Sequence, residues 1–169
     1  MKKVIVVMGS DSDLQVMEGA VRMLRRFGVP FDVRIVSAHR TPAAAETLSK
    51  TAEAEGAGVI IAAAGKAAHL AGVLAANTIL PVIGVPIKSS TWDGMDSLLS
   101  TVQMPSGVPV ATVAINGAEN AAILAVQILA GSEPRLAEAL HAFKLEQEKK
   151  VLEKDENIRK QYSVTEANV

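Results

Sequence analysis

Cysteine is absent from this chain of 169 residues, and aromatic residues make up only 3% of it. The first absence excludes disulfides, thiolate metal sites and cysteine nucleophiles, and it is typical of a reducing compartment. The second absence accompanies a hydrophobic content of 49%. Alanine, glycine and valine therefore supply much of the interior, and helices built from such small residues can approach one another closely.

The chain also lacks a large excess of positive or negative charge, and it has no long hydrophobic run. The formal net charge is −1 at pH 7, so no global field attracts nucleic acid or an anionic membrane. The first apolar run, Val4 to Met8, is too short for a membrane span or for the core of a signal peptide. We therefore predict a cytoplasmic protein that binds a small molecule through local groups, without nucleic acid or membrane as a partner.

Apolar runs alternate with helical patterns along most of the chain. Five nearly continuous runs predict parallel strands buried on both faces, at residues 4–8, 31–36, 59–63, 82–85 and 110–115. Helical spacing or helix boundary signals predict helices at residues 14–24, 42 to about 56, 67–77, 96–103 and 118–129. Right-handed crossovers would then give a doubly wound, three-layer α/β/α sandwich.

The character of the sequence changes after residue 131, where apolar residues become scattered among many charges. One more helix is predicted from Glu133 onward. We therefore divide the chain into an α/β domain, residues 1–131, and a C-terminal helical extension and tail, residues 132–169. The extension has two interpretations: a solvated appendage, or an arm that packs on another subunit.

Polar residues follow the first predicted strand, in the segment Gly9-Ser10-Asp11-Ser12-Asp13. Gly9 allows the backbone to approach a ligand, and the hydroxyls of Ser10 and Ser12 lie where free amides at a helix N-terminus favour phosphate. Asp13 would repel phosphate and suits the hydroxyls of a sugar. Ordinary helix capping by Ser or Asp is the alternative interpretation.

The segment Ser37-Ala38-His39-Arg40-Thr41-Pro42 follows the second predicted strand. In a doubly wound sheet this strand lies beside the first, so Arg40 could pair with a phosphate held by the Ser10 segment. His39 is the best candidate for a general acid and base near neutral pH, with a purely structural histidine as the alternative. Thr41 and Pro42 are predicted to be the N-cap and first residue of the next helix.

The chain contains two further histidines. His69 follows the third predicted strand, where the helix dipole favours a neutral imidazole that forms hydrogen bonds; helix capping is the alternative. His141 lies in the charged C-terminal helix and is predicted to be a surface residue. The sequence has no metal-ligand spacing, so we predict no metal. It has no dinucleotide fingerprint or Walker loop, which argues against dinucleotide and nucleoside triphosphate cofactors, and no nucleophile elbow to support nucleophilic catalysis.

Five segments, taken in order, carry a family resemblance. They are Met8-Gly9-Ser10 with Ser12-Asp13, residues 37–42, Ala64-Gly65 with residues 67–70, residues 81–86, and residues 96–98 with 102–105. Together they resemble the 5-(carboxyamino)imidazole ribonucleotide mutases of purine biosynthesis, over about residues 4–129. The resemblance implies a flavodoxin-like five-stranded parallel sheet with an extra C-terminal helix. It also implies a homo-octamer in which that helix reaches a neighbouring subunit.

The resemblance further implies the reaction of an isomerase without metal or cofactor. The substrate, 5-carboxyamino-1-(5-phospho-D-ribosyl)imidazole, loses its carboxylate as carbon dioxide, which ring carbon 4 recaptures to give 5-amino-1-(5-phospho-D-ribosyl)imidazole-4-carboxylate on the route to IMP. His39 is the implied catalytic acid and base. The implied substrate-binding residues are Ser10, Ser12, Asp13, Ser37, Arg40, Gly65, Ala67, Ala68, His69 and Leu70.

Lys66 departs from the family pattern, because glycine is common there in the mutases. The related aminoimidazole ribonucleotide carboxylases, which use carbon dioxide directly, carry a basic residue at that position. Against a carboxylase, this chain keeps Arg40-Thr41-Pro42 and Ala67-Ala68-His69, where those enzymes diverge. Direct carboxylation is therefore the alternative to the mutase reaction. A non-catalytic module that binds a nucleotide or flavin on the same fold is a further alternative.

Overall fold

Five parallel strands form one sheet, in the order β2-β1-β3-β4-β5, in a computed structural model that describes residues 1–90 and 92–163. The strands are β1 (Lys3–Met8), β2 (Phe31–Ile35), β3 (Ala57–Gly65), β4 (Val82–Ile87) and β5 (Ala111–Thr112). The chain moves outward from β1 to β2 and then returns to the other side of β1 to form β3. The connections on the two sides of β1 therefore diverge at the β1/β3 boundary, which is where doubly wound sheets bind ligands.

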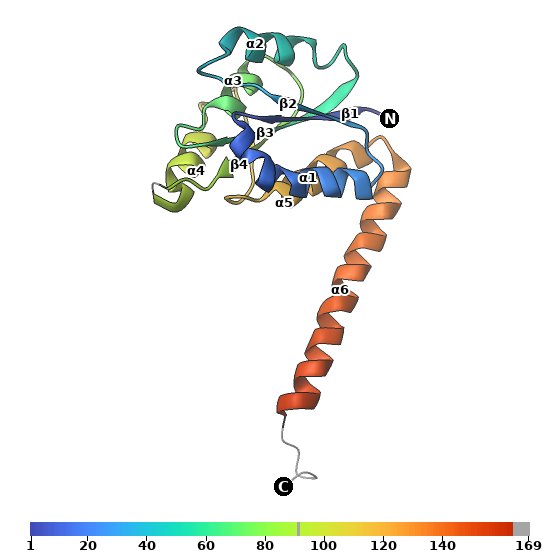
Figure 1. The fold of residues 1–169 in the computed structure, drawn as a ribbon. Helices are drawn as coiled ribbons and strands as arrows, with labels where there is room; N and C mark the ends of the chain where they lie inside the picture. The colour runs from blue at the N-terminus through green and yellow to red at the C-terminus, as the bar shows by residue number, and fades with distance from the viewer. Residues whose placement is uncertain (91, 164–169) are drawn as a thin grey trace.

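The described residues form six α-helices, and Figure 1 shows how they are arranged relative to the sheet. They are α1 (Leu14–Arg26), α2 (Pro42–Thr51), α3 (Leu70–Ala76), α4 (Met95–Val102), α5 (Ala118–Ala130) and α6 (Pro134–Tyr162). Helices α1 and α5 cover one face of the sheet and α2 and α3 the other, while α6 extends far from this body. The predicted three-layer, flavodoxin-like sandwich with a C-terminal helix is confirmed.

Alternation along β1 divides the core into two layers. Val4, Val6 and Met8 pack with the α1 and α5 side, whereas Ile5 and Val7 pack with the α2 and α3 side. All five side chains are buried, and burying one aliphatic side chain of this size stabilises a fold by about 1.5–3 kcal/mol. A strand that contributes to both layers has no polar face, which explains why its sequence is a continuous apolar run.

Two of the five predicted strands are not buried on both faces, so that part of the prediction is wrong. In β2, Val33 and Ile35 are 41% and 60% exposed. This strand is the edge of the sheet and pairs only with β1. The run at residues 110–115 forms a strand of only two residues, β5, because it pairs with β4 at Ala111 and Thr112 alone.

Several helix boundaries also differ from the prediction. Helix α2 ends at Thr51, and residues 52–56 form a turn that ends at Gly56, where φ is +84°. Helix α3 begins at Leu70 instead of residue 67, and residues 66–69 form a non-helical connection in which Lys66 has a positive φ of 56°. The other predicted helices are found within a few residues of their expected ends.

Among the described residues, the contacts of helix α6 with the α/β body lie in its first half, where Arg26 of α1 also pairs with Glu146. Leu136 is fully buried, and Phe143 lies edge-on to Phe27 with ring centroids 5.6 Å apart. Beyond that point Val151 and Leu152 are 64% and 61% exposed. Within residues 1–90 and 92–163 no helix combines the length and hydropathy that a membrane span requires. The end of the predicted tail, residues 164–169, lies outside the described residues.

Candidate active site

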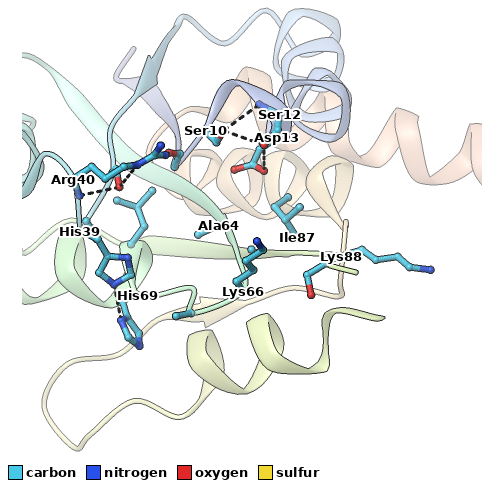
Figure 2. A pocket seen from close by; sticks show the side chains of 17 residues that line it. Ser10, Ser12, Asp13, His39, Arg40, Ala64, Lys66, His69, Ile87 and Lys88 are labelled. Atoms are coloured by element: carbon cyan, nitrogen blue, oxygen red, sulfur yellow. Dashed lines mark hydrogen bonds between the residues drawn. The ribbon is translucent and has the colours of Figure 1, made fainter. Parts of the chain in front are cut away.

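A cavity of about 620 Å³ opens where β1, β2, β3 and β4 end. The strand register brings these ends together, since Met8 pairs with both Ile35 and Ala63, and Gly65 pairs with Ile87. The loops that follow the four strands therefore project from one edge of the sheet, and Figure 2 shows their side chains converging. A cavity of this size suits one small organic ligand.

Ser10 begins the first of these loops. Its hydroxyl caps a short 3-10 turn, Asp11–Asp13, by accepting a hydrogen bond from the Ser12 amide at 3.3 Å. The Ser12 hydroxyl lies 3.0 Å from the same oxygen. Ser10 and Ser12 thus form a compact pair of hydroxyls that also lines the cavity. Ser10 therefore caps the turn and also faces the cavity, so the two interpretations of this residue are compatible.

Asp13 is a buried carboxyl at the end of the same turn. Burial raises the pKa of Asp13 above its ordinary value, and the charge of Asp11 raises it further, although hydrogen bonds from the Ser12 side chain and the Ser10 backbone act in the opposite direction. Within the described part of the chain no cation forms an ion pair with it. Its oxygens are therefore suited to accept hydrogen bonds from ligand hydroxyls.

The turn from Ser37 to Thr41 positions the second set of side chains. The Thr41 hydroxyl accepts a hydrogen bond from the Ser37 amide at 2.9 Å and donates one to the Ser37 carbonyl at 3.0 Å. Thr41 occupies the N-cap position of α2 as predicted, but its side chain does not cap the helix. It closes the turn instead, together with the Ser37 hydroxyl, which accepts from the Arg40 amide at 3.1 Å.

Arg40 joins this turn to the Ser10 loop. Its Nη2 donates to the Gly9 carbonyl oxygen at 2.9 Å, which fixes the guanidinium beside the serine hydroxyls. No carboxylate pairs with Arg40 among the ion pairs of the described residues. Arg40 Nε also donates to the Ser37 hydroxyl at 3.5 Å, but a guanidinium has five N–H donors, so these two bonds leave others for an anion. Arginine beside two serine hydroxyls is a suitable site for phosphate.

His39 and His69 come from different loops and meet at the cavity. His39 Nε2 and His69 Nδ1 are 2.9 Å apart, and the rings are edge-to-face with an interplanar angle of 81°. His69 immediately precedes α3, yet its side chain forms no capping hydrogen bond, so the capping interpretation is wrong. His141 is exposed on α6, as predicted.

Lys66 follows β3 with φ at +56°. Figure 2 shows its side chain pointing toward Ile87, whereas the Lys88 side chain points away from the other labelled residues. Lys88 Nζ instead lies 3.1 Å from Asp93 Oδ1. Lys66 is therefore a further cationic side chain among the residues that line the cavity.

All of the predicted site residues line this cavity except Ala68, which is buried beside it. The sequence prediction did not include Ile87, Lys88 and Ser89 in the site, although all three line it. They follow the predicted strand at residues 82–85, and parallel strands end at the same edge of a sheet, so the strand pattern contained the signal that could have found them. The binding and catalytic roles of these residues remain predictions. In the described part of the chain no group of three or more metal-ligating side chains is found.

Comparison with known proteins matches the chain both to proteins named mutases and to the phosphoribosylaminoimidazole carboxylase of Schizosaccharomyces pombe, which is 56% identical over 155 residues, covering 92% of this chain and 28% of that protein. The model of the AIR carboxylase family matches residues 3–150. The chain is 57% identical over 149 residues to the N5-carboxyaminoimidazole ribonucleotide mutase of Pyrococcus horikoshii, covering 88% of this chain and 84% of that protein. It is 53% identical over 158 residues to the protein of the same name from Thermotoga maritima, covering 94% and 92%. The crystal structure of Treponema denticola PurE superposes with a TM-score of 0.84 at 29% identity, covering 92% and 98%.

Proposed function

The chain belongs to the AIR carboxylase family, and from this membership and the site we propose that it is an enzyme of purine biosynthesis that acts as an N5-carboxyaminoimidazole ribonucleotide mutase. Its substrate is a small molecule, a phosphoribosyl imidazole that carries a carboxylated amine. The reaction moves that carboxylate to ring carbon 4 and leaves the atomic composition unchanged.

The observation that carries this proposal is the contact between Arg40 and Gly9. It places a guanidinium beside Ser10 and Ser12, and it places the adjacent residue, His39, in the same cavity. If the phosphate binds to Arg40 and the two serine hydroxyls, the imidazole ring of the substrate would extend toward the two histidines. Asp13, a buried carboxyl that lines the same cavity, would accept hydrogen bonds from the ribose hydroxyls.

The proposed mechanism has two proton transfers, both at His39. In the first step the bond between the exocyclic nitrogen and the carboxylate breaks, carbon dioxide forms, and protonated His39 gives its proton to that nitrogen. In the second step the electron-rich ring carbon 4 attacks carbon dioxide, and neutral His39 removes the proton from that carbon. The two transfers cancel, so the enzyme returns to its starting state.

Gly65, Ala67, Ala68 and Leu70 are proposed to hold the carboxylate and the carbon dioxide formed from it. Small side chains allow backbone amides to approach an oxyanion closely. The Leu70 side chain lines the cavity and is almost completely buried, so it provides a dry wall. A dry wall would keep carbon dioxide near ring carbon 4 until it is recaptured.

Direct carboxylation of the uncarboxylated aminoimidazole is the second candidate, and Lys66 is the observation that favours it. Its ammonium group belongs to the cavity lining, where a cation could attract bicarbonate. The relatives named above as mutases favour the first candidate. A module that binds a nucleotide or flavin without turnover would not require the convergent histidines.

The proposal extends to the assembly. We infer that residues 1–131 form the catalytic domain, that residues 132–169 form an extension, and that the chain assembles into a homo-octamer, as the family resemblance implies. The apolar residues exposed along α6 support a role for this helix in contacts between subunits. We further propose the cytoplasm as the location, in keeping with the absence of cysteine.

Incubation of the purified protein with each candidate substrate, with and without bicarbonate, tests the function. The mutase proposal predicts conversion of the carboxyamino compound in bicarbonate-free buffer. Turnover of only the uncarboxylated compound, and only with bicarbonate, would establish the carboxylase instead. Tight binding of either compound without any turnover would support the non-catalytic module.

A further inference from the structure

His39 and His69 form a direct hydrogen bond between two imidazole rings. Their facing nitrogens, Nε2 of His39 and Nδ1 of His69, are 2.9 Å apart, and the ring centroids are 5.1 Å apart. The dashed line in Figure 2 marks this contact. Both residues line the cavity, although they are thirty positions apart in the chain. No expectation from the sequence paired them.

A hydrogen bond between two ring nitrogens needs one N–H group and one lone pair. The contact therefore has two arrangements. In the first, His39 donates from Nε2 and His69 accepts at Nδ1. In the second, His69 donates from Nδ1 and His39 accepts at Nε2. The two arrangements differ in which ring nitrogen of His39 can exchange a proton with a ligand.

The proposed reaction distinguishes between these arrangements. His39 must carry an extra proton in one half of the cycle, and a protonated imidazole has N–H groups at both nitrogens. Its Nε2 can then only donate. If His69 were the donor, the bond would break each time that His39 became protonated. Only the first arrangement, in which His69 accepts, persists through both halves of the cycle.

We propose that His69 is a positioning residue that accepts a hydrogen bond from His39 Nε2–H throughout the reaction. This inference rests on the proposed mutase function. It makes Nδ1 of His39 the atom that gives and receives the proton, because Nε2 is occupied by His69. Serine proteases use a carboxylate behind the catalytic imidazole to fix its tautomer in the same way. Here a neutral imidazole takes that place and fixes the tautomer without a negative charge.

The backbone at both histidines is well supported, which leaves the ring orientation to this bond. The turn that carries His39 is closed by the Thr41 amide, which donates to the Ser37 carbonyl at 2.9 Å. The His69 amide donates to the Ala67 carbonyl at 2.9 Å, and its own carbonyl accepts from Val73 at 3.0 Å. Each ring still rotates about its side-chain torsions, and the mutual hydrogen bond selects one orientation.

Two substitutions separate this role from direct substrate binding by His69. In His69→Asn the side-chain oxygen lies close to the position of the original Nδ1 and can still accept a hydrogen bond from His39. The rest of the imidazole ring, including Nε2, is removed. In His69→Leu no acceptor remains. We expect kcat to fall at least ~10²-fold in His69→Leu with KM little changed, because the tautomer of the catalytic group is no longer fixed. We expect His69→Asn to recover kcat to within about tenfold of wild type.

A spectroscopic measurement tests the same inference without relying on activity. The chain has three histidines, so solid-state NMR of protein labelled with ¹⁵N-histidine contains three rings, and exposed His141 is an internal reference. In mildly alkaline buffer we expect His39 to be protonated at Nε2 in wild type and His69→Asn. We expect a mixture of tautomers in His69→Leu.

Three results would overturn the inference. The first is a wild-type His39 that carries its proton at Nδ1. The second is an unchanged His39 tautomer in His69→Leu. The third is an equal loss in His69→Asn and His69→Leu with a raised KM, which would assign His69 to direct contact with the substrate. If the wild type has no mutase activity, the proposed function fails, and the NMR result still decides whether His69 orients His39. Thermal melting of both variants verifies that they fold.

Discussion

His39 is the only residue to which the proposed mechanism gives a proton transfer in both steps. His39→Asn keeps hydrogen-bonding capacity at similar size but cannot titrate. We predict that kcat falls by at least ~10²-fold, which is the low end of the rate loss expected when a general acid and base is removed. Binding of the product should survive. The matched control is His141→Asn, which changes an exposed histidine on α6 and should leave kcat unchanged. A His39→Asn variant that melts and binds normally but keeps more than roughly a tenth of kcat would assign His39 a structural role.

Asp13 gives a prediction about stability and pH. Its folded pKa is raised by burial above the ordinary value of 3.8, so the folded state holds this proton more tightly than the unfolded state. The cost of the buried charge is absent below that ordinary value and is fully present above the raised one. We therefore predict that Asp13→Asn melts at a higher temperature than wild type at pH 7, and that the difference shrinks as the pH falls toward 3.8.

Calorimetry across this pH range measures the effect of Asp13→Asn. The control is Asp11→Asn, which removes an exposed carboxylate from the same turn and should change the melting temperature less. A lower melting temperature for Asp13→Asn at pH 7 would show that the hydrogen bonds of the carboxylate outweigh its burial.

At the scale of single residues, the sequence predicted which side chains line the cavity better than it predicted the contacts between them. His39, Arg40 and Ser10 were identified because each follows a predicted strand, and the ends of parallel strands converge. The contact between His39 and His69 depends on how two side chains rotate across the β1 strand that separates their loops. The positive φ of Lys66 also has no signal in the sequence, since glycine and asparagine are the residues that usually indicate such a conformation.

At the scale of elements, the burial of the three central strands was predictable, and the exposure of the strands at the edges of the sheet was not. Strands β1, β3 and β4 are buried on both faces and appear as apolar runs. In the run that forms β2, Asp32 and Arg34 alternate with apolar residues, and its position at the edge of the sheet leaves the apolar Ile35 exposed as well. Strand order decides this exposure, and the order depends on how crossovers pack against the whole sheet.

Close packing between β4 and α4 gives a prediction at this scale. A Cβ atom at Gly84 would lie 2.4 Å from Thr101 Cγ2 and 3.0 Å from Val110 Cγ1. Gly84→Ala should therefore destabilise the protein by about 1–3 kcal/mol, because the helix or the loop must move away from the strand. The measurement is the free energy of unfolding in denaturant.

The matched control for Gly84→Ala is Gly131→Ala at the end of α5. The backbone there is already helical, with φ at −60°, and the nearest atom to an added Cβ is the Ile128 carbonyl oxygen at 3.4 Å. This substitution should leave stability unchanged or raise it by up to about 1 kcal/mol. Equal effects of the two substitutions would contradict the packing argument.

At the scale of the whole molecule, the exposed part of α6 is the feature that a single chain does not explain. Val151→Glu with Leu152→Glu places two charges on apolar positions that are 64% and 61% exposed. If α6 packs on a neighbouring subunit, this variant should lower the mass of the assembly measured by light scattering, while the α/β body still melts cooperatively. Desolvation of the new carboxylates in the interface is the physical reason.

The control for the α6 variant is Gln147→Glu, which adds negative charge at an exposed polar position of the same helix. It should leave the mass unchanged. A wild-type protein that is already monomeric, or a charged variant of unchanged mass, would favour the solvated appendage. The sequence left this choice open because scattered apolar residues among charges are compatible with both interpretations.

The central claim is that the carboxylate migrates within one active site. The most direct test supplies the carboxyamino substrate with ¹³C in its carboxylate and an excess of unlabelled bicarbonate in the buffer, and follows the label by NMR. We predict that the product carries ¹³C at the carboxylate on ring carbon 4, because carbon dioxide is recaptured before it escapes. A product whose carboxylate comes from the unlabelled pool would contradict the account and establish that free carbon dioxide or bicarbonate is the true substrate.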